Sequence, residues 1–296
     1  MHNLYFDIAA TTPLDRNIAE LMTEIQNTVF GNPSSIHQFG QKSRSIVEKA
    51  RRQISKSLNS KPNEIIFTSG GSESNNLVLQ GLLNPGDHLI TSSYEHPAII
   101  NVAKELEKKG VEVSYVKPNT NGVINSENIK KNIQDNTTLI SIMYVNNELG
   151  CINPIEKIIN IAKENNIKTH TDAVQLIGKG ILDLNILKVD YLSIAPHKYY
   201  GPKGIGALVI RRRDGKRPPL SPLMYGGGQE LGLRPGTLPV PLIVGLGKAA
   251  ELSRKEALER KKALKRKRDE KPVKRKKREK KNKYILEKES QQYKQI

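Results

Sequence analysis

The chain has 296 residues, long enough for a buried core and more than one lobe. Its formal net charge of +18 lies mainly in residues 254–283, where 18 Lys and Arg stand against 5 Asp and Glu, whereas residues 1–253 carry 28 basic and 23 acidic groups, as an ordinary soluble domain does. The single cysteine, Cys151, excludes an intramolecular disulfide, no Cys/His cluster has metal-ligand spacing, and no segment suits a signal peptide or a bilayer span, so we expect a cytoplasmic protein without a metal.

Short β-branched or apolar runs alternate with helical patterns between residues 43 and 211. The runs that predict strands are Glu64 to Thr68, His88 to Ser92, Val111 to Val116, Thr138 to Tyr144, Lys168 to Thr171, Tyr191 to Ile194 and Gly206 to Arg211. The stretches with helical periodicity are Ser43 to Leu58, Ala98 to Lys108 and Ile155 to Asn165. This alternation predicts an α/β fold around a mainly parallel sheet flanked by helices.

A glycine turn, Ser69-Gly70-Gly71-Ser72, follows the first predicted strand and opens a predicted helix. Free backbone N–H groups and the positive end of a helix dipole make such a turn a cradle for phosphate, to which Ser72 can add a hydroxyl. A simple strand-to-helix connection with a serine cap explains the same residues equally well.

Polar or ionisable groups follow four more of the predicted strands. They are Tyr94 to Pro97, Asn146 to Glu148, Asp172 with Gln175, and His197 with Lys198. Each has a plain structural explanation as a helix cap, a turn residue or a solvated lysine. Because ligands bind outside the carboxyl ends of parallel strands, the whole set together favours one site at that edge of the sheet.

The chemistry that uses this combination of groups is that of pyridoxal 5′-phosphate (PLP). A lysine amine forms an imine with the cofactor aldehyde, and an acid keeps the ring nitrogen protonated so that the ring accepts electrons. Lys198 and Asp172 suit these two roles. His96 suits stacking on the ring, and Asn147 and Gln175 suit hydrogen bonds to the ring hydroxyl.

Eight motifs, in the same order along the chain, resemble those of cysteine desulfurases, which are class V aminotransferase-like PLP enzymes of fold type I. The motifs are YFDIAATT (5–12), FGNPSSIHQFG (30–40), FTSGGSESNN (67–76), YEHPAI (94–99), NNELG (146–150), TDAVQ (171–175), APHKYYGPKGIG (195–206) and GGGQELGLRPGT (226–237). The similarity runs from about Leu4 to about Leu252.

The resemblance implies a role for each matching residue. Lys198 would form the Schiff base and, with His96, act in catalysis. The implied cofactor-binding residues are Gly71, Ser72, His96, Asn147, Asp172, Gln175, His197, Lys198 and Thr237. The first two and His197 would lie around the phosphate, and Thr237 would reach the phosphate in the other subunit of a homodimer. The implied reaction converts L-cysteine to L-alanine and passes sulfur to an acceptor or scaffold protein for iron–sulfur cluster or thio-cofactor synthesis.

The chain also departs from that family. Ala195 stands where relatives have a phosphate-binding serine, and the downstream loop cysteine and substrate-binding arginine have no counterpart after Leu252. Cys151 could replace the missing nucleophile, or it could be a small packed residue. Three hypotheses for the function therefore stay open: a desulfurase, a PLP-binding protein without that activity, and a selenocysteine lyase or another class V enzyme.

We expect three regions: residues 1–15 as an arm of an incomplete small domain, 16–252 as the PLP-binding large domain, and 253–296 as a basic tail that is first helical and then disordered. The tail could be a nucleic-acid-binding arm, a solvated extension, or unrelated sequence after a frameshift or truncation. Charge alone is weak evidence for nucleic-acid binding, so we expect neither nucleic acid nor membrane as a partner.

Overall fold

The computed structural model describes residues 4–212, 215–259 and 262–263. The chain divides into two units, Met1–Arg254 and Lys255–Ile296. In the second unit the described residues, 255–259 and 262–263, are helical, and the rest of the predicted basic tail lies outside the described residues. The three-region division predicted above stays a prediction. The account below concerns the first unit.

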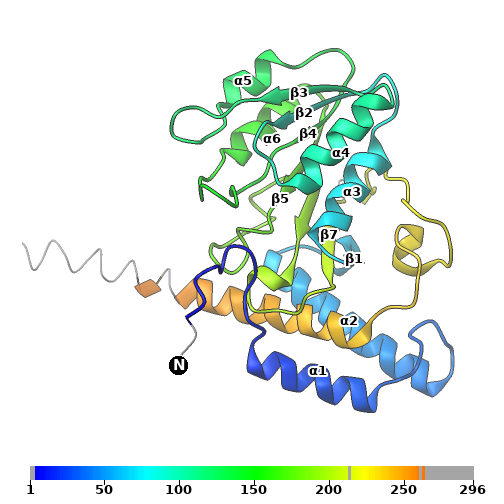
Figure 1. The fold of residues 1–296 in the computed structure, drawn as a ribbon. Helices are drawn as coiled ribbons and strands as arrows, with labels where there is room; N and C mark the ends of the chain where they lie inside the picture. The colour runs from blue at the N-terminus through cyan, green and yellow to red at the C-terminus, as the bar shows by residue number, and fades with distance from the viewer. Residues whose placement is uncertain (1–3, 213–214, 260–261, 264–296) are drawn as a thin grey trace, which may run out of the picture. The chain divides into compact units, whose positions relative to one another are not determined.

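The first unit is built on a seven-stranded sheet (Figure 1). Its strands are β1 (Ile65–Thr68), β2 (His88–Ser92), β3 (Glu112–Val116), β4 (Thr137–Ser141), β5 (Lys168–Asp172), β6 (Tyr191–Ile194) and β7 (Gly206–Ile210), in the spatial order β1-β7-β6-β5-β4-β2-β3. The β1–β7 and β7–β6 pairs are antiparallel, and the other four pairs are parallel. The predicted α/β fold with a mainly parallel sheet is confirmed, and all seven predicted strands are present with small shifts at their ends.

Helices cover both faces of the sheet (Figure 1). They are α1 (Arg16–Thr28), α2 (Gln38–Leu58), α3 (Gly71–Leu82), α4 (Pro97–Lys108), α5 (Ser126–Lys131) and α6 (Ile155–Glu164), with three short 3₁₀ turns, η1 (Pro62–Glu64), η2 (Pro196–Lys198) and η3 (Gln229–Gly232), and a helix that begins at residue 240. Neither α1 nor α5 was predicted. An aspartate, Asp15, caps α1 by accepting hydrogen bonds from the Asn17 and Ile18 amides.

Two apolar clusters lie on opposite faces of the sheet. Leu139 and Ile140, consecutive residues of β4, belong to different clusters, as the alternation of side chains along a strand requires. The first cluster joins the sheet to α2, α6 and the helix that begins at residue 240. The second joins it to α3 and α4. Helices on both faces leave the strand ends as the place where polar groups reach solvent.

A glycine is required where β7 passes the turn before α3. A Cβ on Gly206 would lie 2.6 Å from the Gly70 Cα, closer than non-bonded carbon atoms approach. The backbone of β7 therefore lies directly against the turn that opens α3. This close approach fixes the start of α3 at the edge of the sheet.

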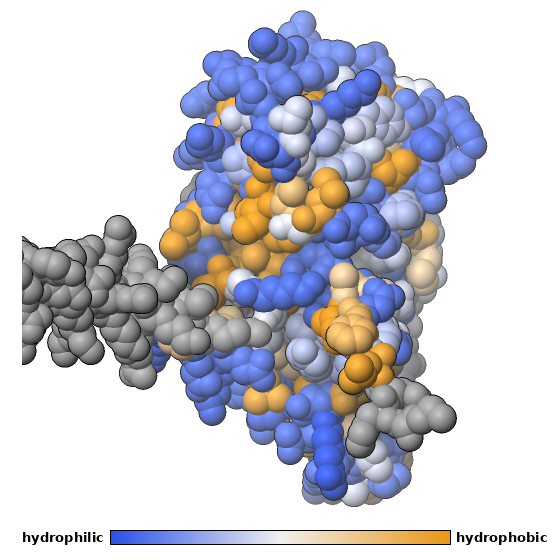
Figure 2. Space-filling model, turned by 60° about the vertical axis from the view of Figure 1, so that its left-hand side comes forward, coloured by the Kyte–Doolittle hydropathy of each residue, from blue (hydrophilic) through white to orange (hydrophobic). Residues whose placement is uncertain are grey.

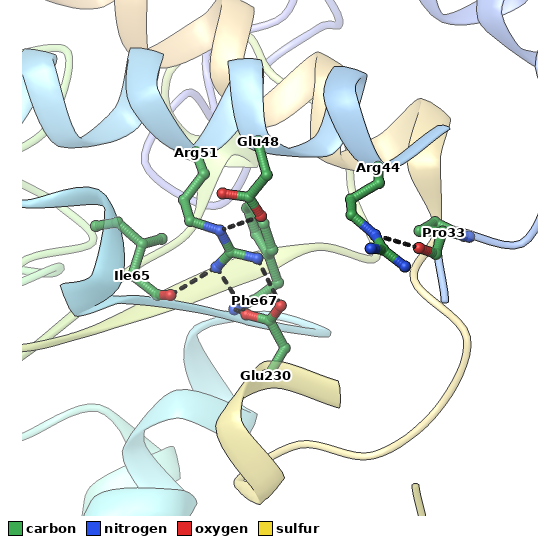
Figure 3. Close-up of polar contacts among 7 residues, drawn as sticks. All are labelled: Pro33, Arg44, Glu48, Arg51, Ile65, Phe67 and Glu230. Carbon is green, nitrogen blue, oxygen red and sulfur yellow. Dashed lines mark hydrogen bonds and ion pairs between the residues drawn. The ribbon is translucent and has the colours of Figure 1, made fainter. Parts of the chain in front are cut away.

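A buried ion pair ties the η3 turn to α2 and β1 (Figure 3). The Arg51 guanidinium donates to both carboxylate oxygens of Glu230, at 2.7 and 3.0 Å, and to the Ile65 carbonyl at 2.7 Å. Glu230 also accepts a hydrogen bond from the Phe67 amide at 2.7 Å, and the Arg51 Cζ lies 4.5 Å from the centroid of the Phe67 ring. Both side chains are satisfied by several partners, as a buried pair must be to offset its desolvation.

Several large apolar side chains of this unit are nevertheless exposed. Figure 2 shows apolar residues gathered in a band across one face, between hydrophilic regions. The most exposed large apolar residues of the unit are Tyr225 at 88%, Ile36 at 87% and Phe6 at 84%. Exposed apolar patches are typical of protein interfaces, membrane interaction sites and ligand-binding grooves.

We predict that Glu230→Ala lowers the free energy of unfolding by about 3–5 kcal/mol, because it leaves the Arg51 charge and the Phe67 amide buried without their carboxylate. Urea unfolding monitored by circular dichroism measures this. Glu105→Ala, which removes an exposed carboxylate paired with Lys108 on α4, is the control and should leave the midpoint unchanged. Equal midpoints for Glu230→Ala and the control would contradict the predicted role of the pair.

Candidate active site

A cavity of about 290 Å³ opens where the carboxyl ends of β5 and β6 and the segments after β2 and β4 meet the start of α3. Eight of the nine predicted cofactor-binding residues line it: Gly71, Ser72, His96, Asn147, Asp172, Gln175, His197 and Lys198. Residues 127 positions apart in the chain thus share one cavity, because parallel strands deliver their carboxyl ends to the same edge. Thr237 is exposed and does not line the cavity.

Asp172, the last residue of β5, places a buried carboxylate in the cavity wall. Burial raises its pKa, and hydrogen bonds from the Asn75 Nδ2 at 2.7 Å and the Val174 amide at 3.0 Å counter the rise. The positive charge of Lys198 acts in the same direction as these hydrogen bonds. The site therefore holds a carboxylate that gains from any further cationic or N–H partner in the cavity.

The sequence did not single out Asn75, although its signal was present. It lies on α3 four residues after Gly71, and residues four apart share a helix face. Its Oδ1 is buried and has no hydrogen-bond partner within the described structure. Asn75 therefore orients Asp172 with its amide nitrogen and leaves an acceptor near the cavity.

Lys198 lies at the end of η2, half-buried, with its amine directed at the N-terminal segment. Its Nζ donates to the carbonyl oxygens of Ala9 and Ala10 at 2.8 and 2.6 Å. Burial lowers the pKa of Lys198, and the charges of Asp172 and Asp7 counter part of that shift. A lowered pKa increases the fraction of neutral amine, the form that attacks a carbonyl carbon.

Gln175 joins the same segment to a second lysine. Its Nε2 donates to the Ala9 carbonyl at 3.0 Å, and Lys179 donates to its Oε1. Burial, followed by the charge of Lys198, lowers the pKa of Lys179. The sequence did not predict a role for Lys179 or for the carbonyls of the N-terminal segment. The carbonyls contact residues far away in the sequence, and Lys179 contacts the predicted residue Gln175.

The phosphate cradle predicted around Gly71 stays a prediction. No side chain caps the start of α3, and Gly71 and Ser72 of its first turn line the cavity. A Cβ on Gly71 would lie 3.0 Å from the Val174 Cγ2. Ala195 is fully buried in the cavity wall and supplies no hydroxyl, as its sequence position indicated.

His197 and His96 stand on two other sides of the cavity. The His197 Nδ1 lies 3.2 Å from the Thr11 hydroxyl, and burial with the charges of Lys198, Lys203 and His96 lowers the pKa of His197. The His96 Nδ1 accepts a hydrogen bond from the Ala98 amide at 3.1 Å, so His96 caps α4 while lining the cavity. The capping explanation and the site explanation hold together for this residue.

Two remaining candidates lie as follows. The Asn147 side chain lines the cavity and donates to Glu148 at 2.9 Å. Cys151 is half-buried, its Sγ lies 3.3 Å from the Asn121 carbonyl, and it does not line the cavity. In the described part of the chain, no group of three His, Cys, Asp or Glu could hold a metal ion, and no helix has the length and apolarity needed to cross a membrane.

The family model for class V aminotransferases matches residues 4–295. The chain belongs to the class V aminotransferase family. It is 48% identical to the mitosomal cysteine desulfurase of Trachipleistophora hominis and 47% identical to the cysteine desulfurase IscS of Dictyoglomus turgidum, over 86% and 84% of this chain. The chain spans only 58% and 64% of the length of these two relatives.

Solved structures give the same assignment. A structure described as SspA in complex with cysteine is 46% identical with a TM-score of 0.80, covering 84% of this chain and 72% of that one. A NifS-like protein is 40% identical with a TM-score of 0.82, covering 86% and 71%. The predicted family and fold type I are confirmed, and enzymes of this family depend on PLP.

The residues of the cavity fit this cofactor. An uncapped helix start suits a phosphate, a lysine of lowered pKa suits an aldehyde, and a buried carboxylate suits a pyridinium nitrogen. The cavity volume of about 290 Å³ lies near the lower end of the range for small-molecule sites. The specific contacts of each residue stay predictions.

Glu95, next to His96, makes stability depend on pH. Burial raises its pKa to about 8, with the charge of Asp172 adding to the rise and hydrogen bonds from Ser92 and Met143 opposing it. A carboxyl group whose pKa is raised by folding stabilises the fold most below its unfolded pKa and loses that contribution as pH rises toward the folded value.

We predict that wild type loses stability relative to Glu95→Gln by about 1.4 kcal/mol per pH unit between the two pKa values of Glu95, because glutamine cannot ionise. Urea unfolding of both proteins at pH 5, 6, 7 and 8 measures the difference. A difference that stays constant with pH would contradict the buried, protonated state of Glu95.

Proposed function

We propose that this chain binds PLP through Lys198 and uses it to remove sulfur from L-cysteine. The observation that carries the proposal is the meeting of Lys198, Asp172, His96 and the α3 start in one cavity. Relatives named cysteine desulfurases and a similar protein solved with cysteine support the choice of substrate.

When bound, PLP supplies an electron-accepting ring conjugated to the amino group of the substrate. In the proposed arrangement, Asp172 holds a proton on the ring nitrogen, and Asn75 and the Val174 amide keep the carboxylate turned toward it. His96 would pack against the ring. The first turn of α3, Ser72 and His197 would hold the phosphate, and Asn147 and Gln175 would hold the ring oxygen.

When Lys198 bonds to the cofactor, its hydrogen bonds to the N-terminal segment would break. In the structure, the carbonyls of Ala9 and Ala10 hold the Lys198 amine, which must turn away from them to form a covalent bond. Gln175 would still hold the Ala9 carbonyl at 3.0 Å. The segment thus forms one wall of the cavity throughout.

The overall reaction requires a thiol as sulfur acceptor. The Cβ–S bond of cysteine breaks, its sulfur joins the acceptor thiol as a persulfide, and Cβ takes up a proton with the bonding electron pair to give alanine. Cys151 lies outside the cavity, which supports an acceptor thiol from another molecule. Sulfur delivery to an acceptor or scaffold protein for iron–sulfur cluster or thio-cofactor synthesis is part of the proposal.

A homodimer is the assembly we propose. Thr237 is exposed and away from the cavity of its own chain, as a residue that serves a second subunit would be. The exposed apolar band in Figure 2 also suits an interface. A reducing compartment such as the cytoplasm accords with a lone free cysteine, although four relatives carry the name mitosomal or mitochondrial.

The second candidate function is binding of PLP without desulfurase activity. The position of Cys151 outside the cavity favours it. A selenocysteine lyase or another class V activity shares the same cavity chemistry and is tested by exchanging the substrate.

We predict that the PLP-loaded protein releases alanine from L-cysteine in the presence of an excess thiol. Lys198→Ala should lower this rate by on the order of 10²–10⁴-fold, because it removes the amine that carries the chemistry. Alanine is measured by amino-acid analysis, and sulfide by a colorimetric assay. L-Selenocysteine serves as the alternative substrate.

Cys151→Ser is the matched control, and we expect it to retain the wild-type rate, since an external thiol accepts the sulfur. A large loss in Cys151→Ser would make Cys151 the acceptor instead. Bound PLP with no turnover of either substrate would refute the enzyme proposal and leave the binding protein.

A further inference from the structure

Glu95 is a buried carboxyl group outside the cavity that joins the ends of two strands. The Ser92 hydroxyl at the end of β2 and the Met143 amide after β4 both contact it, the amide lying 3.0 Å from each carboxyl oxygen. Only 6% of the residue is exposed. A buried carboxyl with several partners is costly to place, so its position is closely determined.

The segment that carries Glu95 also carries His96, which lines the cavity. The Asn146 Nδ2 donates to the Tyr94 carbonyl at 3.0 Å, and the Tyr94 hydroxyl donates to the Asn153 side chain at 2.9 Å. The Ala98 amide holds the His96 ring at its Nδ1. Glu95 and Tyr94 thus both contact the segment between β4 and α6, and Glu95 makes the contact nearest to His96.

We propose that Glu95 is a positioning residue that holds the His96 ring over the cofactor by tying the 94–96 turn to the ends of β2 and β4. The predicted effect of Glu95 on the cofactor rests on the proposed PLP site, whereas the hydrogen bonds of Glu95 do not depend on it. Without the carboxyl group, the Met143 amide and the Ser92 hydroxyl lose their shared partner, and the turn keeps only its contacts through Ser93, Tyr94 and the Ala98 amide.

Because of the protonation of Glu95, the Glu95→Gln variant closely mimics the wild-type side chain. Since burial raises its pKa to about 8, Glu95 is largely protonated at pH 7 and resembles a carboxamide in charge and shape. Glutamine keeps an oxygen that accepts from both the Met143 amide and the Ser92 hydroxyl. Alanine removes this side-chain oxygen. Comparing Glu95→Gln with Glu95→Ala therefore tests whether the hydrogen bonds of residue 95 position the turn.

The first test uses the protein without PLP. Imidazole NMR signals of the six histidines are recorded, and the His96 signal is assigned by its loss in His96→Ala. We expect Glu95→Ala to shift or broaden the His96 signal and Glu95→Gln to leave it in place. Glu105→Gln on the exposed side of α4 is the control and should leave the spectrum unchanged.

The second test uses the PLP-loaded protein. Glu95→Ala should weaken PLP binding by roughly 10-fold, as loss of an outer-shell partner does, and lower the visible circular dichroism per bound PLP toward that of His96→Ala. The double variant should lose no more signal than His96→Ala alone, because Glu95 acts through His96. Glu95→Gln should restore the wild-type signal.

The proposal is overturned if Glu95→Ala leaves the His96 NMR signal unchanged, or if folded Glu95→Gln loses as much signal as Glu95→Ala. If Glu95→Ala does not fold, Ser92→Ala replaces it, and an unchanged His96 signal there is equally contradictory. Failure of wild type to bind PLP would refute the proposed function alone, because the NMR test needs no cofactor.

Discussion

The Asp172 carboxylate lies almost wholly out of water at the end of β5, and the arrangement of the cavity follows from keeping it there. A carboxylate in such surroundings needs hydrogen bonds and nearby positive charge to stay ionised. α3 supplies the Asn75 amide, the turn after β5 supplies the Val174 amide, and η2 supplies the charge of Lys198. Moving any of these elements would remove one of the partners of Asp172.

The same constraint explains why the cavity suits a cationic ring. Asp172 has fewer partners than a carboxylate can accept, since its two oxygens each take one hydrogen bond within the described structure. A protonated ring nitrogen would add the missing partner and gain from a site already prepared for it. A cofactor bound at this position would therefore stabilise the folded protein.

Much of this could be predicted from the sequence. The strand runs were recognisable because each is short, apolar and followed by a polar turn, and the rule that ligands bind at the carboxyl ends of parallel strands placed Asp172 and Lys198 together. The antiparallel direction of β7 was not predicted, although its connection from β6, residues 195–205, is too short for a helical crossover between parallel strands. Arg51 and Glu230 lie 179 residues apart, and nothing in either segment indicates the other. Asn75 and the Ala9 carbonyl were missed for the same reason: their partners are distant in the chain.

The most direct test of the PLP site is chemical trapping of the cofactor. Protein incubated with PLP is reduced with borohydride, digested, and analysed by mass spectrometry for the lysine that carries the pyridoxyl phosphate group. We predict one main modified residue, Lys198. Lys179 should stay unmodified, although it donates a hydrogen bond to the Gln175 side chain. Modification spread over surface lysines, or concentrated on another lysine, would contradict the assignment of Lys198 and with it the proposed function.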